Sequence, residues 1–232
     1  MRFSRIILLA FLGSIALTAC DSHDNNSDHK QLSANQDNDV AALQTEAEKG
    51  DRNAQFALAV RYQFGNGVKP DFNKAADWYS KAANAGHLGA MNNLAALYFD
   101  GKGVERNYTK AGELYKQLAD VGDMGATASL AGMYVDGKGV SQDYNEAMRL
   151  FLIAADHGYA PAQSSIGLMY KFGWGVPKDG IKAYAWWTLA SENGDKFATD
   201  NMSQLKQSFS SSDVEQAQKI ANKIRNESKA RR

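Results

Sequence analysis

The sequence contains few of the residue types that most often carry chemistry. Its 232 residues include one cysteine and four histidines. A single cysteine excludes a disulfide framework within the chain. The histidines are not spaced as metal ligands, and none stands beside a candidate nucleophile. We therefore expect no metal site, no other cofactor and no catalytic residue.

An excess of charge of one sign is also lacking. Lysine and arginine together number 26, as do aspartate and glutamate, so the formal net charge is zero. The only basic cluster is the terminal "SKARR". A nucleic-acid-binding protein would show a basic face, so we expect no nucleic-acid partner.

Long apolar runs are confined to the start of the chain. "IILLAFLGSIAL" follows Arg2 and Arg5 and is shorter than the roughly 20 residues of a membrane-spanning helix. The pattern predicts a signal peptide over residues 1–19. "LTAC", residues 17–20, resembles a bacterial lipobox, and the resemblance implies cleavage before Cys20 and lipid attachment to Cys20. An ordinary secretory leader with a chance cysteine is the alternative.

Residues 20–38 are predicted to form a tether that begins with the lipidated cysteine. The stretch is rich in Asp, Asn and Ser, and it has too few apolar residues to bury a core. We expect a protein that is lipid-anchored in the bacterial cell envelope and faces the periplasm. Asp21 resembles an inner-membrane retention signal, but the choice between inner and outer membrane stays open.

The rest of the chain follows a repeat of 36 residues, marked by tyrosines at 62, 98, 134 and 170 that each precede a Gly-x-Gly turn. Ala54, Leu58, Arg61 and Tyr62 have the spacing of one helix face, and mostly apolar residues recur at these positions in the later copies. A second helix follows each turn, opened by an N-cap residue: Asp71, Asn107, Asp143 or Asp179. A phosphate-binding loop would follow a strand and carry a third glycine, so these loops are interpreted as turns.

These residues resemble the Sel-1-like repeat family, which is related to tetratricopeptide repeats. The resemblance implies an all-α fold, an α/α solenoid that winds as a right-handed superhelix. We expect repeats at residues 51–86, 87–122, 123–158 and 159–194. A half-repeat at residues 39–50 and helices in residues 195–232 would cap the two ends.

Catalysis is the rival class of function. Asp100 and Asp136 are equivalent residues of neighbouring repeats, and two such carboxylates could serve inverting glycoside hydrolysis. Each has a lysine two residues later in a solvent-facing loop. Some cysteine-rich members of the family are described as β-lactamases, but their disulfide-paired helices have no counterpart here. We therefore predict that the protein is not an enzyme, with a β-lactamase-like or other hydrolase as the alternative.

The side of the first helix opposite its buried stripe is predicted to bind a partner, because the same side lines the concave groove of solenoids that resemble tetratricopeptide repeats. A solvated face would be polar, whereas this one carries several apolar residues. The turn aromatics Phe172 and Trp174 would extend this surface. The alternatives are that the apolar residues pack between adjacent first helices, and that the two turn aromatics tuck into the next repeat. The predicted binding residues are Phe56, Val60, Phe99, Val135, Leu168, Lys171 and Trp174.

The predicted function is that of a non-enzymatic scaffold or adaptor of the cell envelope. Its partner would be another protein or peptide, and no small-molecule substrate is expected. Periplasmic lipoproteins of the resembled family also act as immunity proteins. This gives a sharper alternative, neutralisation of a type VI secretion effector of the phospholipase type.

Overall fold

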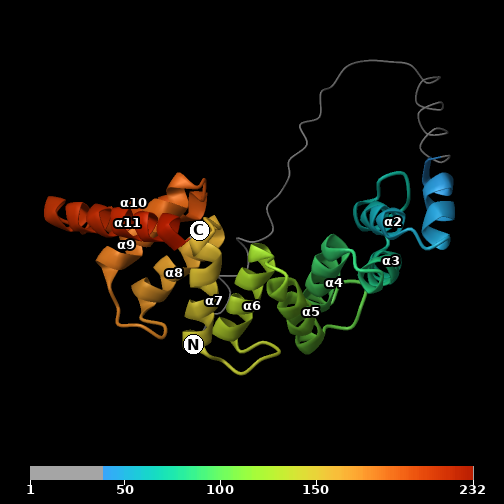
Figure 1. The fold of residues 1–232 in the computed structure, drawn as a ribbon, viewed down its shortest axis with the longest axis horizontal. Helices are drawn as coiled ribbons and strands as arrows, with labels where there is room; N and C mark the ends of the chain where they lie inside the picture. The colour runs from blue at the N-terminus through green and yellow to red at the C-terminus, as the bar shows by residue number, and fades with distance from the viewer. Residues whose placement is uncertain (1–38, 232) are drawn as a thin grey trace, which may run out of the picture. The chain divides into compact units, whose positions relative to one another are not determined.

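The computed structural model describes residues 39–231, and every regular element in this range is a helix. Residues 39–48 form the first described helix. The helices that follow are α2 (Arg52–Phe64), α3 (Phe72–Asn84), α4 (Leu88–Asp100), α5 (Tyr108–Asp120), α6 (Met124–Asp136), α7 (Tyr144–Asp156), α8 (Ala160–Phe172), α9 (Gly180–Glu192), α10 (Lys196–Lys206) and α11 (Ser211–Arg231) (Figure 1). The all-α class and the consecutive helix–turn–helix pairs predicted from the sequence are confirmed. The predicted signal peptide, Cys20 and tether lie outside the described residues.

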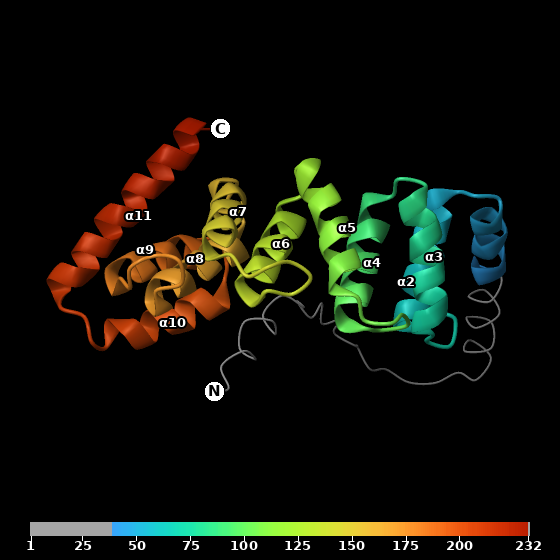
Figure 2. The same ribbon diagram turned by 90° about the horizontal axis from the view of Figure 1, so that it is seen from below.

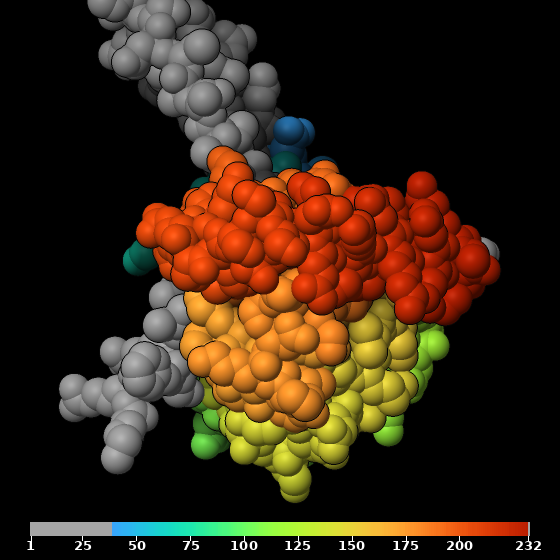
Figure 3. Space-filling view, turned by 90° about the vertical axis from the view of Figure 1, so that its left-hand side faces the viewer, coloured from blue at the N-terminus to red at the C-terminus, as the bar shows by residue number. Residues whose placement is uncertain are grey.

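The described chain divides into two compact units, residues 39–118 and 119–231, and the boundary falls inside α5. In the first unit α2, α3 and α4 lie side by side (Figure 2). In the second unit α10 and α11 both pack on α9 (Figure 3). Within residues 39–231, no helix combines the length and the hydropathy that crossing a bilayer would require.

The first helix of each repeat ends on a glycine with positive φ. At Gly137, φ is 66°, a value that residues with a Cβ adopt only at an energetic cost. The second glycine of the turn also has a positive φ, and it serves a close approach as well. A Cβ on Gly103 would lie 2.0 Å from the carbonyl oxygen of Phe72, at the start of α3. The turn between α4 and α5 therefore lies directly against the backbone of the preceding repeat.

Polar side chains cap the helix starts, as the sequence predicts. Asp71 and Asp143 each accept hydrogen bonds from two backbone N–H groups of the helix that follows. Asn107 caps α5 through a 2.9 Å bond from the backbone N–H of Lys110. Because free N–H groups at a helix start need acceptors, these residues fix where each second helix begins.

The buried cores of both units follow the predicted pattern. In the first unit Ala75, Tyr79 and Leu97 belong to one buried cluster, and the Tyr79 hydroxyl donates a 2.6 Å hydrogen bond to Oε1 of Gln63. In the second unit Trp187 is fully buried, and its indole Nε1–H donates to the Ser164 carbonyl at 3.1 Å. Tyr79 and Trp187 thus each link a second helix to the first helix of its own repeat.

Candidate partner-binding surfaces

The predicted binding residues of the first unit are half-buried between helices. The Phe56 ring stacks on the His87 ring with their centroids 4.2 Å apart. Val60 packs against the buried cluster of α3 and α4. Phe99 meets the Tyr108 ring edge to face at 5.1 Å. Phe56 and Val60 thus pack toward the next first helix, as the alternative interpretation states, whereas Phe99 packs on the second helix of its own repeat.

Val135 and Leu168 are buried, each 7% exposed, so the prediction that they form exposed anchors was wrong. Leu168 lies in one buried cluster with Trp187 of α9 and Ala198 of α10. α8, the first helix of the fourth repeat, is therefore enclosed by α9 and α10. Its side opposite the buried stripe is therefore an internal contact surface.

Lys171 also joins helices to one another. Its Nζ donates a 3.2 Å hydrogen bond to Oδ1 of Asn201. The same ammonium lies 5.4 Å from the centroid of the Trp187 ring. These two contacts link α8 to α10 and α9, so Lys171 contributes to the packing of the fourth repeat.

Exposed aromatic surface does occur in the turn between α8 and α9. Phe172 is 53% exposed and stacks on Trp174, with ring centroids 5.1 Å apart. Trp174 in turn lies nearly parallel to Tyr144 of the preceding repeat, at 6.3 Å and 9°. The Tyr144 hydroxyl accepts a 3.1 Å hydrogen bond from Nε2 of Gln142. We call Tyr144, Trp174 and Phe172 the aromatic ridge.

The same two turn positions carry ion pairs in the second and third repeats. Lys102 Nζ lies 2.9 Å from Oδ2 of Asp100, and Lys138 Nζ lies 2.7 Å from Oδ2 of Asp136. In the second, third and fourth repeats the turn thus brings together the side chains on either side of its first glycine. In the fourth repeat these two side chains are aromatic rings. This turn therefore exposes aromatic surface where the turns of the second and third repeats expose an ion pair.

The candidate catalytic groups have local roles. The two aspartates lie in different units, and each is paired with the lysine of its own turn. His87 caps α4, since its Nδ1 accepts from the backbone N–H of Ala90 at 3.1 Å. Among residues 39–231, no three His, Cys, Asp or Glu side chains are grouped so as to hold a metal ion.

Shifted pKa values also trace packing and ion pairs. Burial raises the pKa of Tyr79 to about 12, and a hydrogen bond with Asn93 opposes the rise. Burial alone would raise the pKa of Asp156, but hydrogen bonds from Arg231 and Ser228 lower it below its ordinary value. Arg231 lies 2.8 Å from Asp156 and fastens the end of α11 to α7. Such shifts mark an active site only where they coincide with a cleft and a partner group.

Sequence reasoning missed the part of the ridge that comes from the preceding repeat. Trp174 and Phe172 were considered as an extension of the binding surface, whereas Tyr144 was not. The signal in the sequence for this contact was the presence of aromatic residues at both position 144 and position 174. Gly175 lies so close to Tyr144 that a Cβ on the glycine would be 2.6 Å from the tyrosine Cβ. This approach brings the two rings together.

Comparison with known proteins identifies the repeats. The model of the Sel1 repeat family matches residues 52–87, 89–123, 126–159 and 160–195. No match is found among curated proteins. Among solved structures the chain is similar to a Sel1 repeat protein from Oxalobacter formigenes, with 28% identity and a TM-score of 0.66 over 76% of this chain and 72% of that one.

Two further structures share the fold. A protective antigen of uropathogenic Escherichia coli with an SLR fold is 35% identical, with a TM-score of 0.63 over 68% of this chain. The match covers 34% of the antigen, so the chain spans about a third of that protein. An immunity protein from Pseudomonas aeruginosa is 18% identical, with a TM-score of 0.51 over 90% of this chain and 84% of that one, a likeness of fold alone. Because the matched repeats make up more than half of the sequence, the protein belongs to the Sel1 repeat family.

Proposed function

We propose that this protein is a non-enzymatic interaction scaffold that binds another protein at the bacterial cell envelope. Its lipid anchor would be Cys20, and the repeats would face the periplasm. Two observations support the binding role: the chain consists largely of Sel1 repeats, and repeat solenoids commonly bind partners along extended surfaces. The proposal of an anchor rests on the lipobox-like sequence before Cys20.

The aromatic ridge is the observation that carries the proposal. Aromatic side chains are enriched at the centres of protein interfaces, where one residue can contribute about 2 kcal/mol or more. Phe172 exposes half of its surface although the equivalent positions of the two preceding repeats hold aspartate. An aromatic side chain in that exposed turn adds little to folding and is well suited to contact with a partner.

A matched substitution tests the ridge. The double variant Phe172→Asp and Trp174→Lys gives the fourth turn the ion pair that the second and third turns already hold. The control, Phe64→Asp with Asn66→Lys, makes the same change in the first turn, where Phe64 is 65% exposed. In quantitative pull-downs from envelope extract, we expect the ridge variant to lose the main partner and the control to keep it.

Circular dichroism of both variants provides the check on folding. Equal capture by the wild type and by a folded ridge variant would contradict the proposed surface. If the ridge variant does not fold, single Phe172→Ser replaces it, since that side chain is the most exposed of the three and its loss leaves the Trp174 contact with Tyr144 in place.

A narrower proposal is that the partner is a secreted effector that this protein neutralises. The similar structure from Pseudomonas aeruginosa is an immunity protein, but the likeness concerns the fold alone. The identity of the captured protein separates the two roles. A captured lipase whose activity falls on binding favours neutralisation, whereas a captured envelope component without such an effect favours scaffolding.

A further inference from the structure

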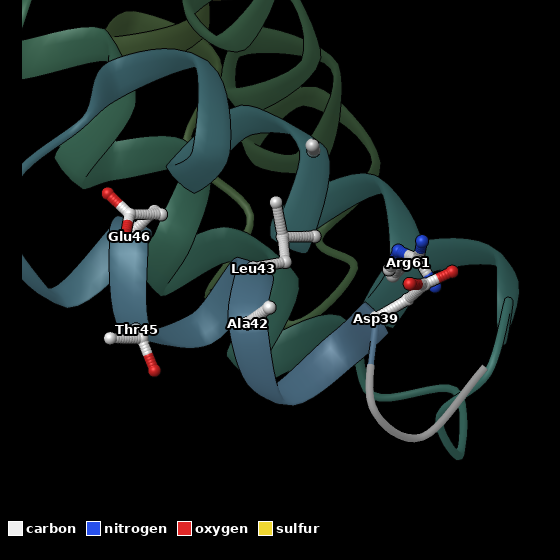
Figure 4. A pocket seen from close by; sticks show the side chains of 7 residues that line it. Asp39, Ala42, Leu43, Thr45, Glu46 and Arg61 are labelled. Carbon is white, nitrogen blue, oxygen red and sulfur yellow. The ribbon is translucent and has the colours of Figure 1, made fainter. Parts of the chain in front are cut away.

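An open pocket of about 580 Å³ lies between the helix of residues 39–48 and α2. Arg61 and Asp39 lie at one end of it, Leu43 and Ala42 in the middle, and Thr45 and Glu46 toward the other end (Figure 4). Ala57 of α2 completes the lining. We call this pocket the N-terminal groove.

The equivalent groove one repeat further along is filled. The residues 36 positions after Asp39, Leu43, Glu46 and Arg61 are Ala75, Tyr79, Ala82 and Leu97, and none is more than 4% exposed. All four belong to the buried cluster that includes Ala59 of α2, with Phe56 and Val60 packed against it. The helix that occupies the equivalent groove is therefore α2.

The same positions are buried again in the second unit. Residues 108 positions after the four groove residues are Ala147, Phe151, Ala154 and Met169, and none is more than 2% exposed. Among the residues that the structure describes, the N-terminal groove thus differs from its equivalents in being open. It also differs in carrying charge, with Asp39, Glu46 and Arg61 where the later repeats have apolar residues.

The sequence one repeat upstream does not supply a suitable helix. The face by which α2 fills its groove includes Phe56, Ala59 and Val60. At the corresponding upstream positions the chain has Cys20, His23 and Asp24. An apolar stripe at helical spacing is therefore missing where the repeat would require it.

We propose that the N-terminal groove binds an amphipathic helix of a partner protein, which completes the helix stack as α2 does one repeat later. This inference rests on the proposed function and names one surface and one kind of partner for it. The partner helix presents small and apolar side chains at i, i+3, i+4 and i+7. Because two carboxylates and one guanidinium line the groove, the helix carries lysine or arginine at the edges of its stripe.

The sequence of α2 provides the probe. The peptide Arg52–Phe64 contains the stripe that fills the equivalent groove, has two arginines and lacks acidic residues. Since a free peptide of this length is marginally helical, the probe carries a helix-stabilising staple on its opposite face and a fluorescent label. Anisotropy titration of this probe with the full chain in detergent micelles measures binding. A second peptide, with serine in place of the three stripe residues Phe56, Ala59 and Val60, is the peptide control.

Two variants test the location. Leu43→Glu places a charge in the middle of the groove, and Ala42→Trp fills it from an exposed position without removing a core group. Gln44→Glu, on the exposed side of the same helix, is the matched control. We expect each groove variant to weaken probe binding at least about tenfold and the control to leave it unchanged. Thermal unfolding followed by circular dichroism shows whether each variant is folded.

Several results would overturn the inference. The inference fails if the full chain does not bind the probe. It also fails if the folded variants Leu43→Glu and Ala42→Trp bind the probe as well as the wild type does. Binding that appears only after deletion of residues 21–38 would mean that the chain's own segment fills the groove. Self-association that Leu43→Glu abolishes would assign the groove to a second copy. If these variants still capture the partner through the aromatic ridge, the proposed function stands although this inference fails.

Discussion

Gly103→Ala should destabilise the second repeat far more than an ordinary glycine substitution. A Cβ at this position would lie 2.0 Å from the oxygen and 2.2 Å from the carbon of the Phe72 carbonyl, and 2.7 Å from the nitrogen of Asn73. These are backbone atoms at the start of α3, which cannot rotate away. The φ of 69° adds strain of about 1–2 kcal/mol, and relief of the overlap costs about 1–3 kcal/mol more.

Gly86→Ala is the matched control in the same unit. Gly86 also has a positive φ, 81°, but the nearest atom to its added Cβ is the flexible Arg52 Nη1 at 3.6 Å. We therefore expect only the strain of about 1–2 kcal/mol there. Urea unfolding gives the difference in free energy, and hydrogen exchange locates the loss in α3 and α4. Equal destabilisation by the two variants would refute the close approach of this turn to the preceding repeat.

Three further predictions concern the core, the C-terminal helix and the anchor. A Cβ on Gly167 would lie 2.3 Å from Nε1 of Trp187, so Gly167→Ala should cost about 2–4 kcal/mol in urea unfolding. Adding Trp187→Phe should restore part of that loss, and a double-mutant cycle without coupling would contradict the contact. Because the folded pKa of Asp156 is lowered, its stabilising contribution is present above pH of about 4 and is lost as pH falls further. The protection factor against hydrogen exchange in the last turn of α11 should then fall in the wild type, and should be low at all pH values in Asp156→Asn. Cys20→Ala should abolish acylation, and palmitate label that still enters this variant would contradict the proposed anchor.

The repeat made the helices and turns predictable from the sequence. Four copies in register fix each first helix, and α2 ends where the sequence predicts the Gly-x-Gly turn after Tyr62. The capping role of Asp143 and the left-handed conformation of Gly137 could be assigned because N-caps and helix-ending turns have local residue preferences. Such features depend on residues close together in the sequence.

The exposed surface was harder to predict, because it depends on which helices cover each face. Periodicity placed Leu168 opposite the buried stripe, but α9 and α10 cover that side too. Arg61 occupies a position that is apolar and buried in the later repeats, yet here it lines an open groove. The ridge contact between Tyr144 and Trp174 joins residues 30 positions apart in successive repeats, and the periodicity within one helix does not reveal it.

Site-specific photo-crosslinking tests the central claim, partner binding at the aromatic ridge, most directly. Phe172 is replaced by the photoreactive residue p-benzoylphenylalanine in the full chain, in cells that produce the protein, and Phe64 is replaced in the same way as the control. Both positions are exposed, at 53% and 65%. We predict one dominant cross-linked protein from position 172 that is absent from position 64. No adduct at position 172, or the same adducts from both positions, would contradict the account.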